Sequence, residues 1–200
     1  MLIYQVPEKR NQVAITFDDG PDPVFTPQVL DILREHDAKA TFFMIGEQMD
    51  KYPDIAKAVF EAGHEIGNHT LTHPFLTKLA PEDIRKQLAE TEERIVRITG
   101  SKPVTFRPPF FDFDDKVAAE VKAFGYHSIG CVNGAAEDWN QPGTEHILEK
   151  TVESLKDGCV FIFHDGYGDR TQTVEALRRL LPILKERGFT TVRADELTRS

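Results

Sequence analysis

The chain has 200 residues, with 24 Lys or Arg against 33 Asp or Glu, and its formal net charge is -9. This length suits a single domain over residues 1–200, and 40% hydrophobic with 28% charged residues is ordinary for a globular protein. The acidic balance argues against nucleic acid as a partner, because phosphate binding depends on basic surfaces, and no apolar run approaches the roughly 18 residues of a membrane span.

Short apolar runs alternate with amphipathic stretches along the chain. The runs predict strands at residues 13–17, 40–45, 65–67, 104–106, 126–130, 160–163 and 190–192. Helices are predicted at 26–36, 53–61, 81–99, 115–124, 144–155 and 173–187, with Thr26 as the first N-cap and Gly100 just past the longest helix. This alternation predicts a parallel sheet with right-handed crossovers, as a closed barrel or an open doubly wound sheet. The chain has no Gly-x-Gly-x-x-Gly loop, which weakens the dinucleotide-binding version.

The positions of the polar residues favour the barrel. Nearly every unusual polar residue directly follows a predicted strand: Asp18, Asp19, His69, Arg107 and His164, with Asp138 in the loop after the fifth strand. In a βα barrel the C-terminal ends of the strands share one face, where catalytic groups gather. We therefore predict an α/β barrel of about seven parallel strands with its site on that face.

Two motifs indicate a divalent metal site. Asp18 and Asp19 precede a Gly-Pro turn, and His69 and His73 are spaced i, i+4, which we interpret as one face of a helical turn. Zinc-type ions bind imidazole nitrogen and carboxylate oxygen and leave a position open for water. Adjacent residues leaving a strand should point apart, so that one carboxylate ligates the ion and the other faces the water. Taken singly, each motif also fits a plain turn or a surface histidine pair.

Two further motifs suggest groups that act around the metal. Arg107 precedes two prolines, which stiffen the backbone, so its guanidinium can tether a carboxylate while the following N–H groups face developing negative charge. His164 ends a buried strand and is a candidate general acid, with Asp138 as its orienting partner and Trp139 as a desolvating wall. A rigid turn with a solvated arginine, and a core histidine, are the alternatives.

The other histidines and the cysteines are expected to be structural. His36 falls at a helix C-terminus, where positive charge is favoured, and His64, His127 and His146 fall in a turn, at a strand start and at a helix start. The two cysteines, Cys131 and Cys159, are predicted to be free thiols, because they fall at opposite ends of neighbouring runs.

Five ordered motifs, at residues 16–21, 69–73, 107–110, 138–139 and 162–165, resemble the polysaccharide deacetylase family, also called the NodB-homology domain or carbohydrate esterase family four. The resemblance covers nearly the whole chain and implies a distorted βα barrel. It implies one divalent metal, Zn²⁺ first and Co²⁺ or Ni²⁺ as alternatives. The residue roles that it implies are Asp18 as catalytic base, Arg107 as its tether, Asp19, His69 and His73 as metal ligands, and His164 as acid with Asp138 as partner. The implied substrate-binding residues are Pro109, Phe110 with its N–H in the oxyanion hole, Trp139, and Ile162 in the acetate pocket.

The resemblance implies a metal-dependent hydrolase that removes acetyl groups from a polysaccharide or oligosaccharide. Phe110-Phe111 replaces the usual Tyr-Gly, and Val132 and Ala135 stand where Trp and Asp are common. Similar departures in the acetylxylan esterase branch favour O-deacetylation of xylan. Residues 165–173 fit N-deacetylases of chitooligosaccharide or peptidoglycan equally well, which is the alternative function. A silent glycan-binding module and a small-molecule amidase on the same barrel are the remaining hypotheses.

The expected setting follows from the start of the chain and from the family. The first residues are too short for a signal peptide, so the chain is either cytoplasmic or a mature or excised domain. Because the implied substrates are extracellular glycans, we expect a secreted or cell-surface monomer.

Overall fold

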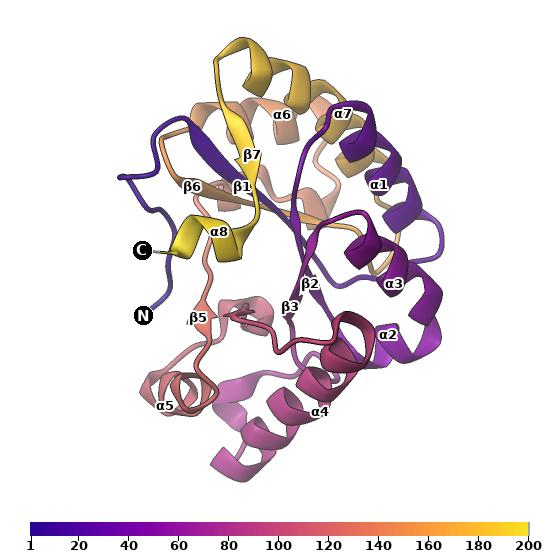
Figure 1. Ribbon diagram of the computed structural model, residues 1–200. Coiled ribbons are helices and arrows are strands. Elements are labelled where there is room, and N and C mark those ends of the chain that lie inside the picture. Colours follow the sequence, from indigo (N-terminus) through magenta and orange to yellow (C-terminus); the bar gives the residue numbers. More distant parts are fainter. Residues whose placement is uncertain (200) are drawn as a thin grey trace.

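The computed structural model describes residues 1–199, and within them seven parallel strands form one curled sheet (Figure 1). The strand order is β5-β4-β3-β2-β1-β6, and β7 also pairs with β1. The strands are β1 (Gln12–Asp18), β2 (Thr41–Met44), β3 (Glu65–Asn68), β4 (Thr105–Phe106), β5 (His127–Ser128), β6 (Cys159–His164) and β7 (Thr190–Val192). The predicted distorted barrel of about seven parallel strands is confirmed.

The barrel is distorted because its two end strands, β5 and β6, are joined through the start of the chain. The Ile3 N–H donates to the Ser128 carbonyl at 2.8 Å, and the Gly130 N–H donates back to the Ile3 carbonyl at 2.8 Å. On the other side, the Val160 N–H donates to the Tyr4 carbonyl at 3.1 Å. The N-terminal segment thus satisfies edge groups that would otherwise remain unpaired.

Helices follow the strands and surround the sheet (Figure 1). They are α1 (Phe25–Glu35), α2 (Gly46–Lys51), α3 (Pro53–Glu61), α4 (Pro81–Thr99), α5 (Asp115–Ala123), α6 (Thr144–Glu153), α7 (Thr171–Glu186) and α8 (Ala194–Thr198). α4 has Glu82 and Asp83 in its first turn and ends at Gly100, whose φ of 74° is left-handed. The sequence did not predict α2 and α8, because six and five residues are too few to display a helical period.

The predicted N-cap of α1 is wrong. Thr26 lies inside the helix, and its hydroxyl donates to Asp165 Oδ2 at 2.6 Å. The N-cap is Val24, and its N–H and that of Phe25, the first residue of α1, donate to Asp22 Oδ1 at 2.8 and 2.9 Å. Asp22 therefore accepts hydrogen bonds of the kind that the sequence pattern assigned to Thr26.

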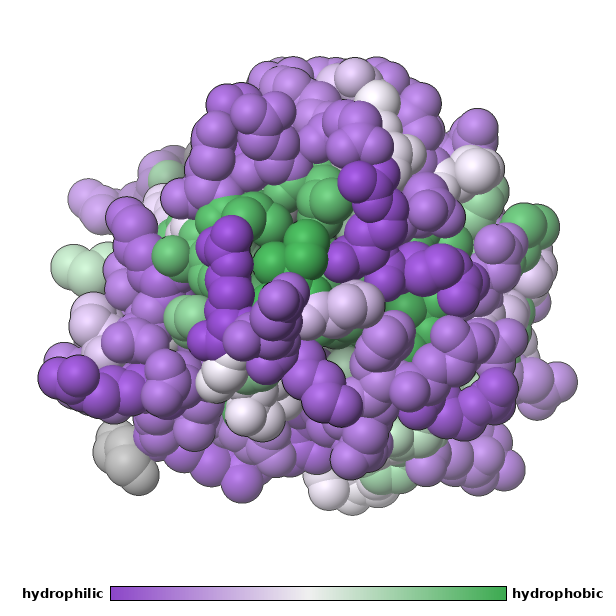
Figure 2. Space-filling view, turned by 90° about the horizontal axis from the view of Figure 1, so that it is seen from above, coloured by the Kyte–Doolittle hydropathy of each residue, from purple (hydrophilic) through white to green (hydrophobic). Residues whose placement is uncertain are grey.

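The face of the molecule seen from above is mostly hydrophilic. Figure 2 shows a hydrophobic area in the middle of this face, surrounded by hydrophilic residues, and smaller hydrophobic areas to its right. Among residues 1–199, none of the helices combines the length and the apolar character that a bilayer crossing needs. Both cysteines are free, as predicted.

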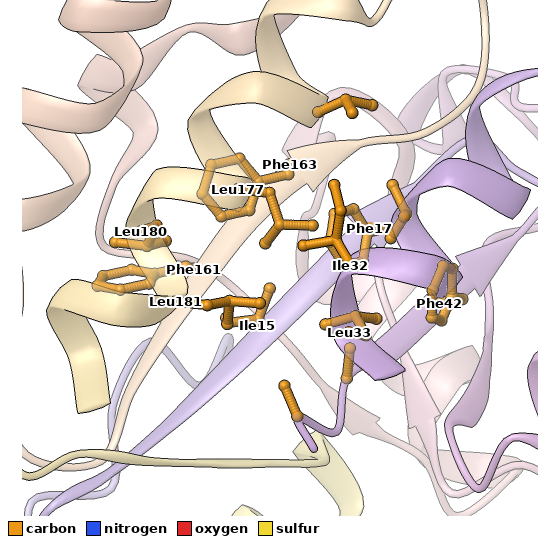
Figure 3. Close-up of a cluster of buried hydrophobic side chains, with 14 of the residues drawn as sticks. Ile15, Phe17, Ile32, Leu33, Phe42, Phe161, Phe163, Leu177, Leu180 and Leu181 are labelled. Carbon is orange, nitrogen blue, oxygen red and sulfur yellow. The ribbon is translucent and has the colours of Figure 1, made fainter. Parts of the chain in front are cut away.

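The main core lies between the sheet and helices α1 and α7. Figure 3 shows Ile15 and Phe17 of β1 with Phe161 and Phe163 of β6, packed against leucines and isoleucines of the two helices. Successive residues of a strand face opposite sides of the sheet. Because Ile15 and Phe17 face outward, Thr16 and Asp18 face the barrel interior, as do Ile162 and His164 on β6.

The N-terminal ends of the strands are covered by α8. Ala194 and Leu197 of this helix pack with inward-facing residues of the strands, including Phe43. The Ala194 N–H donates to Thr41 Oγ1 at 2.8 Å, and the Asp195 N–H donates to Glu65 Oε2 at 3.0 Å. The opposite end of the barrel therefore remains open for a site.

Candidate active site

The polar residues that the sequence singled out meet at the C-terminal ends of the strands. Asp18 ends β1 and lies in register with His164, the last residue of β6. Asn68 ends β3 and Phe106 ends β4, and these two are also in register, so the residues that follow them, His69 and Arg107, leave the sheet side by side.

Asp19, His69 and His73 form a cluster in which the candidate ligand atoms all lie within 4.8 Å of one another. Asp19 Oδ1 lies 3.4 Å from Nε2 of His69 and 3.2 Å from Nε2 of His73. Nδ1 of His69 is 2.7 Å from the Arg107 carbonyl, an arrangement that fixes the ring and directs Nε2 into the cluster. Asp19 Oδ1 is buried without a hydrogen-bond partner, so the cluster is a candidate divalent-metal site.

The backbone that builds this cluster differs from the prediction in two places. Asp19 has a φ of 75°, so the chain turns there, and Asp18 Oδ2 also lies 3.7 Å from Nε2 of His69. The two carboxylates therefore converge rather than point apart. His69 and His73 belong to an irregular loop and not to a helical turn, because Thr70 and His73 have φ values of 68° and 58°.

The local charges prepare the cluster for a cation. Burial alone would raise the pKa of Asp19, but the close approach of His69 and the charges of the surrounding histidines outweigh burial and lower it. Burial lowers the pKa of His73 to about 4, so its imidazole is neutral near pH 7. An ionised carboxylate beside a neutral imidazole is the protonation state that a divalent cation requires of its ligands.

Arg107 is fully buried and holds Asp18. Its Nη1 donates to Asp18 Oδ1 at 2.7 Å and to Thr16 Oγ1 at 2.6 Å. Its Nε and Nη2 donate to the carbonyls of Ile129 at 3.2 Å and Gly130 at 2.8 Å. The guanidinium thus fixes one oxygen of Asp18 and leaves the other directed toward the metal cluster.

His164 and Asp138 form a second ion pair. Nδ1 of His164 lies 2.8 Å from Asp138 Oδ1, and the His164 N–H donates to Asp138 Oδ2 at 2.7 Å. Burial favours the neutral ring, but the charge and hydrogen bond of Asp138 prevail and raise the pKa of His164 to about 9. The Trp139 ring meets the imidazole edge-on, with ring centroids 5.5 Å apart.

These groups open into one cavity of about 370 Å³, lined by Asp18, Asp19, His69, His73, Pro108, Phe110, Phe111, Trp139, Ile162 and His164. Pro109 was expected at the substrate, yet it is buried, and Pro108 lines the wall instead. Phe110 adopts a φ of 56°, which turns its ring outward to 57% exposure. The site therefore combines charged groups on one side with apolar walls on the other.

Sequence reasoning missed three residues that shape the site. Asn133 forms two hydrogen bonds with the Ile162 main chain, at 2.7 and 3.0 Å, and Thr173 Oγ1 donates to Asp138 Oδ2 at 3.0 Å. Arg170 contacts the loops that carry Trp139 and Tyr167. All three lie outside the five motifs and act through the main chain or through another residue. Arg170 and Thr173 fall in the stretch 165–173, which the sequence related to N-deacetylases without assigning a role to either residue.

The histidines expected to be structural lie outside the cavity. Nδ1 of His64 accepts from the Ala40 N–H at 3.2 Å, and burial lowers the pKa of His64 to about 4. His36 caps the C-terminus of α1, and Nε2 of His146 lies 3.0 Å from the Ala135 carbonyl. His127 is exposed on β5.

Comparison with known proteins places this site in a family. The polysaccharide deacetylase model matches residues 5–129. A peptidoglycan-N-acetylglucosamine deacetylase of Bacillus cereus is 40% identical over 199 residues, covering 99% of this chain and 93% of the relative. A chitooligosaccharide deacetylase of Sinorhizobium fredii is 36% identical over 190 residues, covering 88% of this chain and 87% of the relative.

Solved structures agree with these relatives. The Bc1960 peptidoglycan N-acetylglucosamine deacetylase, bound to a benzamide ligand, superposes with a TM-score of 0.91 at 33% identity, covering 97% of this chain and 91% of that one. A family 4 acetyl xylan esterase from Clostridium thermocellum, in complex with a cobalt ion, gives 0.87 at 34% identity, covering 93% and 89%. The chain belongs to the polysaccharide deacetylase family, whose members are hydrolases that remove acetyl groups from carbohydrates.

Proposed function

We propose that this protein removes the N-acetyl group from N-acetylglucosamine units of a glycan, either peptidoglycan or chitooligosaccharide. The observation that carries the proposal is the buried His164–Asp138 pair, which keeps an acid protonated at neutral pH. An amide needs such an acid more than an ester does, because an amine leaves poorly without a proton. The relatives' names favour the same alternative over the xylan esters that the sequence departures suggested.

The residues at the cluster fit a divalent cation. Asp19 Oδ1 is buried without a hydrogen-bond partner and faces the Nε2 atoms of His69 and His73. One carboxylate and two imidazoles suit Zn²⁺, and also Co²⁺ or Ni²⁺. When bound there, the ion would supply Lewis-acid chemistry, lowering the pKa of water and polarising the acetyl carbonyl. We propose Zn²⁺ as the ion used.

Asp18 is proposed as the general base. Its Oδ1 is held by Arg107 at 2.7 Å, which leaves Oδ2, 3.7 Å from Nε2 of His69, to accept the proton of the attacking water. The buried guanidinium fixes the orientation of the carboxylate. Arg107 therefore acts on the reaction through Asp18, as its tether.

His164 is proposed as the general acid. Because Nδ1 is engaged by Asp138, the proton available for transfer is on Nε2. Trp139 shields one side of the ring from water. Nε2 can protonate the leaving nitrogen of the glucosamine unit as the C–N bond breaks.

The acetyl group is proposed to lie against Ile162, whose 3% exposure leaves only a small apolar contact in the cavity. Within residues 1–199, the Phe110 amide donates to no other protein group. This N–H is therefore available to the oxyanion, and one such donor is typically worth about 10²–10³ in rate.

The substrate also sets the expected location and form of the protein. We propose that the chain is one catalytic domain that acts as a monomer on extracellular glycan, secreted or at the cell surface. The proposed activity requires neither a nucleic-acid partner nor a membrane-spanning segment.

A panel of acetylated xylan, chitooligosaccharide and peptidoglycan tests the proposal by acetate release. The protein is first stripped with a chelator, and Zn²⁺ or Co²⁺ is then returned, with Asp19→Ala as the metal-ligand variant. We expect release from the two N-acetylated glycans, loss on stripping and recovery on return of metal. Release from xylan alone would restore the esterase hypothesis, a preference for monomeric acetylated sugars would favour a small-molecule amidase, and binding without release would indicate a silent glycan-binding module.

A further inference from the structure

Arg170 joins two loops that border the cavity. This residue is the N-cap of α7 and is only 6% exposed. Its Nε donates to the Gly166 carbonyl at 2.8 Å and its Nη2 to the Tyr167 carbonyl, both in the loop after β6. Its Nη1 donates to the Trp139 carbonyl at 3.4 Å, in the loop after β5. A single guanidinium therefore connects segments about 30 residues apart in the sequence.

The two connected loops carry exposed aromatic rings on different sides of the site. Trp139 is 39% exposed and its ring contacts the candidate acid, His164, at 5.5 Å. Tyr167 is 51% exposed and its ring lies 6.1 Å from that of His73, in the metal cluster. Exposed aromatic rings beside a cavity can pack on the C–H faces of sugar rings, because these faces are apolar.

We propose that Arg170 is a positioning residue that holds Trp139 and Tyr167 as two walls for sugar rings on either side of the unit that is deacetylated. The preferred substrate would then be an oligosaccharide rather than a single sugar. The inference rests on the proposed function and extends it to Arg170 and Tyr167, which lie outside the family's five motifs.

The Arg170 guanidinium does more than stabilise the N-terminus of α7. The first turn of α7 is capped independently, because the Thr171 N–H and hydroxyl both donate to Asp169 Oδ1. Tyr167 has a positive φ of 53°, which is costly for a residue other than glycine, so this loop requires support to keep its shape. Three main-chain carbonyls around one planar group require the fork of an arginine, which a lysine does not reproduce.

Trp139 is the only tryptophan in the chain, so selectively excited tryptophan fluorescence reports on this wall. The test titrates metal-free protein, which cannot turn over, with the tetramer of N-acetylglucosamine and follows Trp139 emission. Arg170→Ala and Arg170→Lys are compared with Arg178→Ala, an exposed arginine on the same helix whose partner is Glu35 at 3.3 Å. Millimolar guanidinium is added to Arg170→Ala to refill the site.

We expect both Arg170 variants to raise the dissociation constant of the tetramer about tenfold, which is within the range of couplings between contacting residues. In the metal-loaded enzyme, KM for the tetramer should rise more than kcat falls. Guanidinium should restore tetramer binding to Arg170→Ala, and Arg178→Ala should bind like wild type.

An unchanged dissociation constant in both Arg170 variants would overturn the inference. So would kcat falling with KM unaltered, or a loss of binding that guanidinium leaves unrestored while the melting temperature drops. Removing the rings gives a second check, in which calorimetry measures binding because this background lacks tryptophan. If Arg170 acts through the rings, Arg170→Ala should have little further effect on tetramer binding in a Trp139→Ala, Tyr167→Ala background. The proposed function fails separately, if wild-type protein with metal releases no acetate from the tetramer that it binds.

Discussion

Replacing Asp138 with Asn removes the charge that keeps His164 protonated while preserving the size of the side chain. Asn can still accept from the His164 N–H and from Thr173, the other donors to Asp138. Its amide presents hydrogens instead of an anion to Nδ1 of His164. The raised pKa of His164, about 9 against an ordinary 6.5, should therefore fall toward 6.5, since burial opposes the charged ring and only the charges of Asp18 and Asp19 still favour it.

The size of the effect depends on pH. In the metal-free protein at pH 8, about nine-tenths of His164 carries its proton when its pKa is about 9, whereas only about 3% does at 6.5. A bound dication lowers both pKa values, so the rate of the variant at pH 8 should fall by at least about 30-fold. At pH 6 a larger share of both forms is protonated, and the variant should lose less from this cause. The defect should thus grow with pH.

The same pair contributes to stability. A pKa raised from 6.5 to about 9 on folding stabilises the protein by about 3 kcal/mol, at 1.36 kcal/mol for each pH unit. Because the folded pKa is the higher one, this stabilisation is complete below pH 6.5 and is lost as the pH rises through 9. Asp138→Asn should remove that pH dependence from the free energy of unfolding.

Three measurements check this reasoning. NMR titration of His164 and urea unfolding use metal-free protein, because a bound dication would lower the pKa in both forms. Acetate release from chitotetraose with metal is compared as a ratio of wild type to variant, so that pH effects common to both proteins cancel. A ratio that stays constant from pH 6 to 8, or a His164 pKa near 9 in the variant, would refute the link between Asp138 and the acid.

Three other substitutions test the remaining groups. His164→Ala should reduce release from N-acetyl substrates by about 10²–10⁴ and from a matched O-acetyl ester by much less, measured as acetate. Arg107→Met leaves the buried carboxylate of Asp18 unpaired and should lower the free energy of unfolding in urea by about 3–5 kcal/mol while abolishing turnover. His73→Ala removes one ligand and should weaken Zn²⁺ binding by at least about tenfold, measured by competition with a chromophoric chelator.

For each of these three predictions, one result would contradict the assigned role. Equal losses on amide and ester would show that His164 does not protonate the leaving group. An Arg107→Met protein as stable as wild type would mean that Asp18 is not held by a buried charge. Unchanged Zn²⁺ affinity in His73→Ala would place the metal elsewhere, and the exposed His127→Ala serves as the control.

Much of the fold could be predicted from the sequence, because hydrophobic periodicity reflects the local geometry of helices and strands. α3 and α4 lie where the sequence placed them, since proline begins each helix and glycine follows each closely. The loop of His69 and His73 was misread as a helical turn, because spacing alone cannot distinguish a helix from a loop with positive φ at Thr70 and His73. Backbone conformations that tertiary contacts impose produce no periodic pattern in the sequence.

The sequence by itself determined which chemistry is present: the carboxylates after β1, the histidines after β3, Arg107 after β4 and His164 after β6 follow from motif and strand order. Only the tertiary structure decided how these groups lie relative to one another. Asp18 and Asp19 converge on His69, and Arg170 links two loops. The N-terminal segment joins β5 to β6. The physical reason is that residue type and period specify what each element buries. Distances between side chains from different elements depend instead on the twist, register and loop geometry that the whole chain settles together.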